Sequence, residues 1–309
     1  MARALAVPAR GESPTVQDLP SQDPGPGQAR VTVQAASVNG IDAFAAAGYV
    51  WDSMPHEFPV VLGRDFAGIV DAVGDGVTGT DVGDAVAGVV TALELFVGTI
   101  AEQVIFDATE LAPVPSGVTP AQAAAVGLAG ISARDLVDGL GLTGEDVVLV
   151  SGATGGVGAL AVQLAAGTGA TVLATARPGA ESFVRGLGAA HAVDYTSDLA
   201  AAVREVAPEG VTAVVHTAGD PAQLGALLRP GGRLASVVGA TDEQVGRADV
   251  TVIPVLATST PAKLGALVEA VASGSLQVPI AETFPIDDAP ATIAAFASPK
   301  LGKIVVSVA

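Results

Sequence analysis

The chain has 309 residues, of which half are apolar and 15% are charged, and it carries a formal net charge of −18. A chain of this length predicts two domains, because a single hydrophobic core rarely serves more than roughly 250–300 residues. The acidic excess argues against nucleic acid and anionic membrane surfaces as partners, since both attract clustered Lys and Arg. The absence of cysteine excludes disulfides, thiolate zinc ligands and a thiol nucleophile.

The first third of the chain has the alternating pattern of β-strands. The pattern covers residues 30–38, 60–74 and 84–90, and glycine- and proline-rich turns lie between the runs. The apolar stretch at the N-terminus is interrupted by Pro8 and Arg10, which is not typical of a signal peptide. We therefore expect a mostly β domain over residues 1–118 in a cytoplasmic protein.

From residue 119 onward, strands alternate with helices. Thr119 before Pro120 predicts a helix N-terminus. After it we expect strands at 147–152, 170–176, 191–195, 212–219, 232–239 and 251–257, separated by helices at 157–167, 181–188, 198–207 and 221–228. This alternation predicts an α/β domain over 119–258, a Rossmann doubly wound parallel sheet with crossover helices on both faces.

The last fifty residues leave that pattern. They contain a predicted helix at 261–274, a short helix at 287–296 and a final strand at 303–308. We expect residues 259–309 to return to the first domain and complete it.

The segment from Val147 to Ala176 has no charged residue but contains six glycines. Its glycines and hydroxyl side chains, and the acidic pair that precedes it, argue against a membrane-spanning helix. Between the predicted strand and helix lies a G-x-G-x-x-G-like turn, the setting in which this motif binds a dinucleotide. The alternative is a glycine-rich structural turn. The predicted cofactor-binding residues are Ala153, Thr154, Gly155, Gly156, Val157 and Gly158.

The end of the next strand indicates which dinucleotide is bound. An acidic residue there would bind the ribose hydroxyl of NAD, but this strand ends at Arg177 and no acid follows until Glu181. A guanidinium can pair with the 2′-phosphate of NADPH. We therefore predict NADPH as the cofactor, the alternative being that Arg177 is a solvated surface residue.

Eight motifs, in order, resemble the zinc-free branch of the medium-chain dehydrogenase/reductase superfamily, the quinone oxidoreductases related to zeta-crystallin. They are SVNGIDAFAAAGY (37–49), FPVVLGRDFAGIVDAVGDGV (58–77), GTIAEQVIFDATELAPVP (98–115), LAGISA (128–133), GATGGVG (152–158), GAAHAVDY (188–195), LLRPGGRLASVVG (227–239) and GKIVVSV (302–308). The resemblance implies that the first domain is a GroES-like substrate domain and that the protein is a homodimer.

The same resemblance bears on metal binding. The zinc branch places a cysteine where Asn39 stands and a histidine where Arg64 stands. With no cysteine and only three histidines in the sequence, no plausible zinc ligand set remains. We therefore expect chemistry without a metal.

The resemblance also implies site residues. Asn39, Asp42 and Tyr49 correspond to residues on the substrate side, and we take them as the candidate catalytic residues; the alternative is that Asn39 and Asp42 cap a turn and that Tyr49 belongs to the core. The positions that correspond to cofactor contacts are Ser132, Tyr195, Val237, Val238, Gly239 and Lys303. His216 ends a strand where an aspartate is usual, and it is either hydrogen-bonded within a loop or in contact with the cofactor or substrate.

The expected activity is an NADPH-dependent, zinc-independent transfer of hydride to a quinone or an α,β-unsaturated carbonyl compound. Two alternatives remain open at this point. One is an enoyl-thioester or enone reductase of a biosynthetic pathway. The other is an NADPH-binding sensor or structural protein with little turnover.

Overall fold

The computed structural model describes residues 1–308 and divides into two compact units. One unit comprises residues 1–128 together with the chain from Ser259 onward, and the other comprises residues 129–258. The predicted boundary after residue 118 lies earlier than this division. The first turns of helix α2 (Pro120–Leu140) belong to the first unit, because the Leu128 N–H donates a hydrogen bond to Asp65. Helix α2 is kinked immediately before this residue, at Gly127, where ψ is −105°.

The first unit is built on two sheets. Within residues 1–308 the larger sheet has the order β15-β16-β3-β5-β6-β8, with β7 also paired to β3, and the smaller has the order β2-β1-β4. The strands are β1 (Ala2–Val7), β2 (Thr15–Leu19), β3 (Gln28–Ser37), β4 (Val60–Val61), β5 (Asp65–Val73), β6 (Ala85–Val89), β7 (Gln103–Asp107), β8 (Ala112–Pro113), β15 (Ile280–Pro285) and β16 (Lys303–Ser307).

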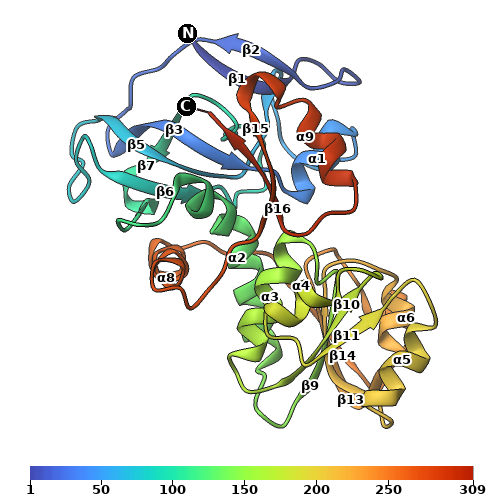
Figure 1. Cartoon of the computed structure of the whole chain (residues 1–309). Helices are drawn as coiled ribbons and strands as arrows, with labels where there is room; N and C mark the ends of the chain where they lie inside the picture. Colours follow the sequence, from blue (N-terminus) through green and yellow to red (C-terminus); the bar gives the residue numbers. More distant parts are fainter. Residues whose placement is uncertain (309) are drawn as a thin grey trace. The chain divides into compact units, whose positions relative to one another are not determined.

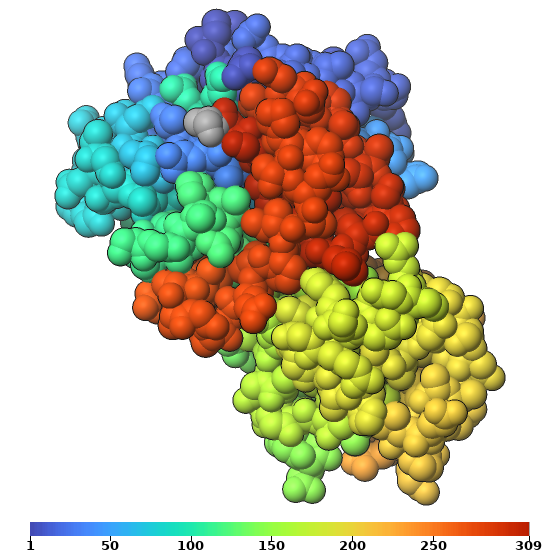
Figure 2. Space-filling model, in the orientation of Figure 1, coloured from blue at the N-terminus to red at the C-terminus, as the bar shows by residue number. Residues whose placement is uncertain are grey.

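The C-terminal strand completes this sheet. Strand β16 pairs antiparallel with β3 and parallel with β15, so the two ends of the sequence share one sheet. Figure 2 shows the C-terminal segment, in red, packed against blue N-terminal segments of the same unit. The helices of this unit besides α2 are α1 (Gly40–Ala46), α8 (Pro261–Ala272) and α9 (Ala291–Ala297), with short 3₁₀ turns at Ala108–Glu110 and Ile286–Asp288.

The expected continuous strand at 60–74 is wrong, because the chain turns between β4 and β5. Gly63 lies at the turn with a φ of +100°, a conformation that favours glycine. A Cβ at this position would lie 2.5 Å from the Ile100 nitrogen, so no larger residue fits without movement. The turn places Arg64 and Asp65 at the start of β5, where both are buried.

The second unit is a parallel sheet with the order β11-β10-β9-β12-β13-β14. Its strands are β9 (Val147–Ser151), β10 (Thr171–Ala176), β11 (His191–Asp194), β12 (Val211–His216), β13 (Leu228–Ser236) and β14 (Thr251–Pro254). Its helices are α3 (Gly156–Ala166), α4 (Glu181–Gly186), α5 (Leu199–Val206), α6 (Pro221–Gly225) and α7 (Asp242–Val245). Helices α3 and α4 cover one face of the sheet, and α5 and α6 cover the other (Figure 1). This is the Rossmann doubly wound arrangement that the alternating pattern predicts.

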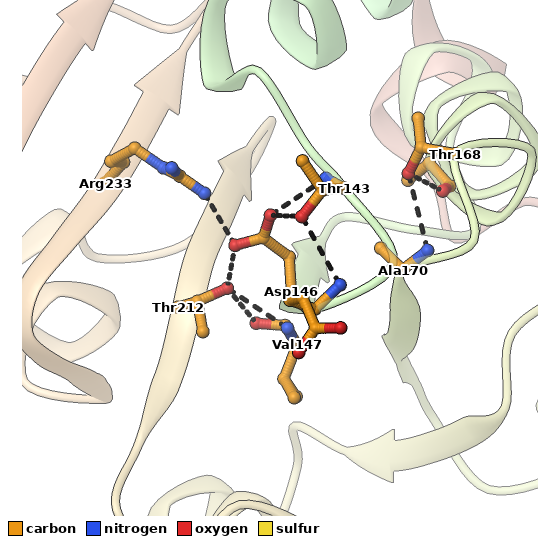
Figure 3. A network of polar contacts seen from close by, with 9 residues as sticks. Thr143, Asp146, Val147, Thr168, Ala170, Thr212 and Arg233 are labelled. Atoms are coloured by element: carbon orange, nitrogen blue, oxygen red, sulfur yellow. Dashed lines mark hydrogen bonds and ion pairs between the residues drawn. The ribbon is translucent and has the colours of Figure 1, made fainter.

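A carboxylate network ties together the amino-terminal half of this sheet (Figure 3). The Asp146 carboxylate accepts hydrogen bonds from the Thr143 N–H at 2.9 Å and from the Thr212 hydroxyl and the Arg233 guanidinium, both at 2.6 Å. Burial raises the pKa of Asp146, but these donors outweigh it, so the pKa lies below its usual value. The network joins the start of β9 to β12 and β13, and it lies at the edge of the sheet opposite the carboxyl ends of the strands.

Candidate active site

The carboxyl ends of the parallel strands meet at one edge of the second unit. The register pairs His216 at the end of β12 with Ser151 of β9 on one side and with Ser236 of β13 on the other. The strand order reverses between β9 and β12, because β10 and β11 lie on one side of β9 and β12 to β14 on the other. Ligands of open α/β sheets bind at such a switch point.

The glycine-rich turn between β9 and α3 lies at this switch point. Gly155 precedes the first turn of α3 and provides no side-chain cap, so the first N–H groups of the helix are left for an external acceptor. A Cβ at Gly158 would lie 2.1 Å from the Gly152 carbonyl oxygen, so this close approach of helix and turn requires glycine. Gly152 itself has a φ of +76°. An uncapped helix N-terminus of this kind suits a pyrophosphate group, and the geometry therefore fits a dinucleotide.

The predicted determinants of the cofactor's 2′-phosphate lie on adjacent strand ends. Arg177 follows the last residue of β10, Tyr195 follows the last residue of β11, and the register places these two last residues opposite each other. Both side chains are exposed, Tyr195 by 50%. Within residues 1–308 no ion pair involves Arg177, so its guanidinium is available to an anionic ligand.

The other predicted cofactor residues of this unit differ in exposure. Val238 follows β13 and is 52% exposed, and Gly239 beside it has a φ of +79°. Ser132 lies within α2 and is 7% exposed. His216 is 2% exposed, and its two ring nitrogens lie 3.0 Å from the Ser236 hydroxyl oxygen and 3.1 Å from the Gly219 carbonyl oxygen. His216 is thus hydrogen-bonded to the last residue of β13 and to the turn that follows β12.

Two of the three candidate catalytic residues, Asn39 and Asp42, are buried in the first unit, and their side chains are hydrogen-bonded. The Asn39 amide nitrogen donates to the Ser37 carbonyl at 3.2 Å and to Asp65 at 3.1 Å, and its oxygen accepts from Lys303 at 2.7 Å. Both amide hydrogens are therefore used, and these contacts do not support the expected role of Asn39 as a donor to the substrate.

Asp42 has a role in the turn that precedes β5. Its carboxylate accepts hydrogen bonds from the N–H of Asn39 at 2.8 Å, at the start of α1, and from the N–H of Gly63 at 2.7 Å. Burial raises the pKa of Asp42 to about 6, and the two N–H donors oppose that rise. The contacts make Asp42 a residue that positions Gly63 and Asn39, with no carboxylate oxygen left without a donor.

Tyr49 is placed differently. Its side chain is 75% exposed, and its ring lies edge-on to that of Phe44 at a centroid distance of 6.2 Å. The described residues provide no partner for its hydroxyl group. Among the three candidate catalytic residues, Tyr49 is therefore the one with a free hydrogen-bond donor.

Sequence reasoning missed Asp65, which links four groups in this region. One carboxylate oxygen accepts from the Ser37 N–H at 2.9 Å and the Ser37 hydroxyl at 2.6 Å. The other accepts from Asn39 and from the Leu128 N–H at 3.2 Å. Asp65 is fully buried. The signal that could have found it is a charged residue inside an otherwise apolar strand pattern, because an internal charge of this kind needs partners.

Lys303 enters the same region from the C-terminal strand. Its ammonium donates to the Val38 carbonyl at 3.0 Å and to the Asn39 amide oxygen, and it is 4% exposed. Burial lowers the pKa of Lys303, and the negative charges of Asp65 and Asp42 oppose that change. The structure thus places Lys303 beside Asn39 in the first unit, where it fixes the orientation of that amide.

Arg64 supports a neighbouring loop. Its guanidinium donates to the carbonyl oxygens of Ala92 at 2.9 Å and Glu94 at 3.2 Å. Residues 1–308 contain no group of three or more His, Cys, Asp or Glu side chains that could hold a metal ion.

The helices of this protein are short or carry charged residues. Within residues 1–308, no helix is long and apolar enough to cross a membrane.

Comparisons with known proteins agree with this architecture. Residues 25–116 match the alcohol dehydrogenase GroES-like domain family, and residues 187–306 match the zinc-binding dehydrogenase family. The quinone oxidoreductase from Coxiella burnetii is 25% identical with a TM-score of 0.88, over 100% of this chain and 99% of that one. An alcohol dehydrogenase superfamily protein from Novosphingobium aromaticivorans is 30% identical with a TM-score of 0.86, over 100% of both chains.

Curated relatives extend the comparison. A mycocerosic acid synthase-like polyketide synthase of Mycobacterium tuberculosis is 37% identical over 220 residues, which are 69% of this chain and 10% of that protein. The chloroplast envelope quinone oxidoreductase homolog of Arabidopsis thaliana is 36% identical over 208 residues, 65% of this chain and 62% of that protein. The chain thus matches about a tenth of the length of the polyketide synthases.

The fold, the two family matches and the full-length structural relatives define the class. The chain belongs to the medium-chain dehydrogenase/reductase superfamily, also called the alcohol dehydrogenase superfamily. This confirms the resemblance to quinone oxidoreductases found in its sequence motifs. It is an oxidoreductase of a family that binds a nicotinamide cofactor.

Proposed function

We propose that this chain is an NADPH-dependent reductase that transfers hydride, without a metal, to a quinone or an α,β-unsaturated carbonyl compound. The observation that carries the proposal is the exposed, unpaired Arg177 at the end of β10, one strand from the uncapped turn of α3. In a protein with a net charge of −18, the helix N-terminus and this arginine provide local positive potential for a phosphate-rich ligand.

The residues of the second unit would hold the cofactor. The first N–H groups of α3 would bind the pyrophosphate, and Arg177 with Tyr195 would border the 2′-phosphate. A bound NADPH would supply the hydride. The exposed Val238 and Gly239, whose φ is positive, are assigned to the nicotinamide end, following the family resemblance.

A residue of the first unit would stabilise the negative charge that develops on the substrate oxygen. Negative charge develops on a carbonyl oxygen as hydride arrives, and a hydrogen bond directed at it lowers the barrier. We assign this donor role to the free hydroxyl of Tyr49. Three buried residues would act indirectly, because they hold the turn before β5 and the start of α1 in place: Asn39, Asp42 and Lys303. Water would provide the proton.

Cofactor choice can be tested by binding. Arg177→Glu is expected to weaken NADPH binding by about 100-fold or more, because a charge-assisted contact is replaced by repulsion, and to change NADH binding less than threefold. Arg204→Glu, which makes the same charge change at an exposed position of α5, is the matched control. Equal losses for both cofactors, or equal effects of the two variants, would remove Arg177 from the site.

Substrate class can be tested by turnover. We expect oxidation of NADPH with quinones or simple enones, and Tyr49→Phe should lower kcat by about tenfold or more while leaving the dissociation constant of NADPH unchanged. Absence of turnover with tight cofactor binding would favour a sensor or structural role. If Tyr49→Phe leaves kcat unchanged, Tyr49 is not the donor.

A second candidate is the reduction of an enoyl thioester, which the similarity to polyketide synthases favours. The probes are one enoyl group carried on coenzyme A and the same group on N-acetylcysteamine, which lacks the phosphates. Turnover of the thioesters without turnover of quinones would establish this alternative. A preference for the phosphate-free thioester would fit the negative charge of the protein.

A further inference from the structure

His216 is a buried ionisable residue to which the proposed reaction gives no role. It ends β12 at the carboxyl edge of the sheet, opposite Ser236 of β13. Its side chain is 2% exposed, so it offers almost no surface to a ligand. Its contacts nevertheless reach the turn that follows β13, and that turn carries predicted cofactor contacts.

The direction of the His216–Ser236 hydrogen bond follows from the other contacts of Ser236. The Ser236 oxygen accepts hydrogen bonds from the Val238 N–H at 3.2 Å and the Ala240 N–H at 3.1 Å. These two bonds use both lone pairs of the hydroxyl oxygen. The hydroxyl hydrogen is then the remaining group that can reach the histidine, and it is donated to Nδ1 at 3.0 Å.

The second ring nitrogen completes the assignment. Nε2 lies 3.1 Å from the Gly219 carbonyl oxygen, which can only accept, so Nε2 carries the proton. His216 is therefore neutral with a defined tautomer. Burial lowers its pKa, while the Gly219 carbonyl and the charge of Asp220 oppose that change.

The groups near the ring come from several elements. The one charged group that affects its pKa is Asp220, which immediately precedes α6. The neutral Gln244 of α7 lines a pocket that His216 also borders, and the paired positions of β9 and β13 are the neutral Ser151 and Ser236. No positive charge is found among these groups, so the lowered pKa results from burial.

The two hydrogen bonds of His216 connect two turns. Gly219 belongs to the turn after β12, and Ser236 binds the turn of residues 237–240 through two N–H groups. A pocket of about 260 Å³ lies between these turns, bordered by His216, Gly219, Val238 and Ala240. The width of this pocket and the conformation of Val237–Gly239 therefore both depend on the histidine–serine pair.

We propose that His216 is a positioning residue, which acts through the Ser236 hydroxyl to set the 237–240 turn for binding of the nicotinamide dinucleotide. This inference rests on the proposed function. In this role His216 does not contact the cofactor directly; its neutral imidazole accepts a hydrogen bond from the Ser236 hydroxyl. A protonated imidazole could not accept it, and the serine oxygen has no lone pair left for a third donor.

A matched pair of variants separates the two hydrogen bonds. His216→Asn places an acceptor where Nδ1 lies and keeps the bond from Ser236, whereas His216→Gln places a donor near Nε2 and keeps only the bond to Gly219. We expect the dissociation constant of NADPH to rise less than threefold in His216→Asn and about tenfold in His216→Gln. Ser236→Ala also removes the acceptor for the Val238 and Ala240 N–H groups, so it should raise this dissociation constant at least as much as His216→Gln. The melting temperatures of the two histidine variants should agree, since each loses one hydrogen bond.

The pH dependence provides a second readout. In the wild type, NADPH affinity should be full above the ordinary histidine pKa and fall as the pH drops through the lowered pKa of His216. His216→Asn should lack this acid limb. Equal losses of affinity in the two histidine variants, or the same acid limb in His216→Asn, would overturn the proposal. If the wild type bound neither NADPH nor NADH, the proposed function and this inference would both be wrong.

Discussion

Replacement of Asp65 by asparagine is the sharpest test of the buried network in the first unit. The carboxylate accepts four hydrogen bonds, two on each oxygen, from Ser37, Asn39 and Leu128. An asparagine has one accepting oxygen, so in either orientation its NH₂ group faces two buried donors. Each donor left without an acceptor costs about 1–3 kcal/mol, which gives an expected loss of about 2–6 kcal/mol.

The assay is urea unfolding at neutral pH followed by tryptophan fluorescence. Trp51 is the single tryptophan of the sequence, and it is 6% exposed in the core of the first unit, so its signal reports on that unit. Asp71→Asn is the matched control. Its carboxylate binds Arg30 and Thr32 at the part-exposed edge of β5, and its loss should cost about 1 kcal/mol or less.

A second variant tests whether charge contributes. With Asp65 neutral, the buried Lys303 ammonium loses one of the two negative charges that compensate it. Lys303→Met should therefore cost less in the Asp65→Asn background than alone, by more than about 1 kcal/mol. The reasoning is refuted if Asp65→Asn costs no more than Asp71→Asn. Additivity of Asp65→Asn and Lys303→Met within about 0.5 kcal/mol would refute the charge argument.

Three further predictions follow from the structure. Gly158→Ala should weaken NADPH binding and lower the melting temperature, because its Cβ would meet backbone at 2.1 Å, whereas Gly186→Ala in α4 has free space and should be neutral or stabilising in the same assays. The pKa of Asp42 is raised to about 6, so protonated Asp42 contributes roughly 3 kcal/mol to the free energy of unfolding below about pH 4, and this contribution is lost as the pH rises through 6. Asp42→Asn should flatten that part of the stability profile, measured by Trp51 fluorescence. The lowered pKa of Asp146 acts in the opposite direction, with stability present above about pH 4 and lost on further acidification, and an unchanged acid transition of Asp146→Asn by circular dichroism would contradict it.

Local patterns account for what could be predicted about the second unit. The alternation of strands and helices, the N-cap at Thr119 and the glycine turn at 152–158 each depend on residues within a few positions of one another. The doubly wound sheet follows from these patterns because connections between parallel strands are short and right-handed. The strand ends shifted by a few residues, which leaves the predicted site at the same edge of the sheet.

The first unit was predicted less completely. Its alternating runs identified a mostly β region, but the single strand expected at 60–74 is divided by Gly63, which has a positive φ and lies close to the backbone of Ile100. The sequence analysis did not predict helix α1, because this helix is short and the residues beside it have the pattern of a loop. Strands β7 and β16 both pair with β3, which lies far away from them along the chain, so periodicity gives no information about these pairs.

The sequence alone indicated the class of protein through motifs that resemble a known family, and it predicted the glycine-rich turn and the candidate arginine beside it, because a strand, a turn and a helix are recognised from short-range order. Only the tertiary structure decided what several candidate residues can do. Asn39 and Lys303 are 264 positions apart, yet their contact uses the amide oxygen of Asn39, while Asp65 takes up one of the amide hydrogens. His216 and Ser236 likewise meet only because β12 and β13 are neighbours. The available donors and acceptors of a side chain depend on all its neighbours, and folding brings those neighbours together from distant positions.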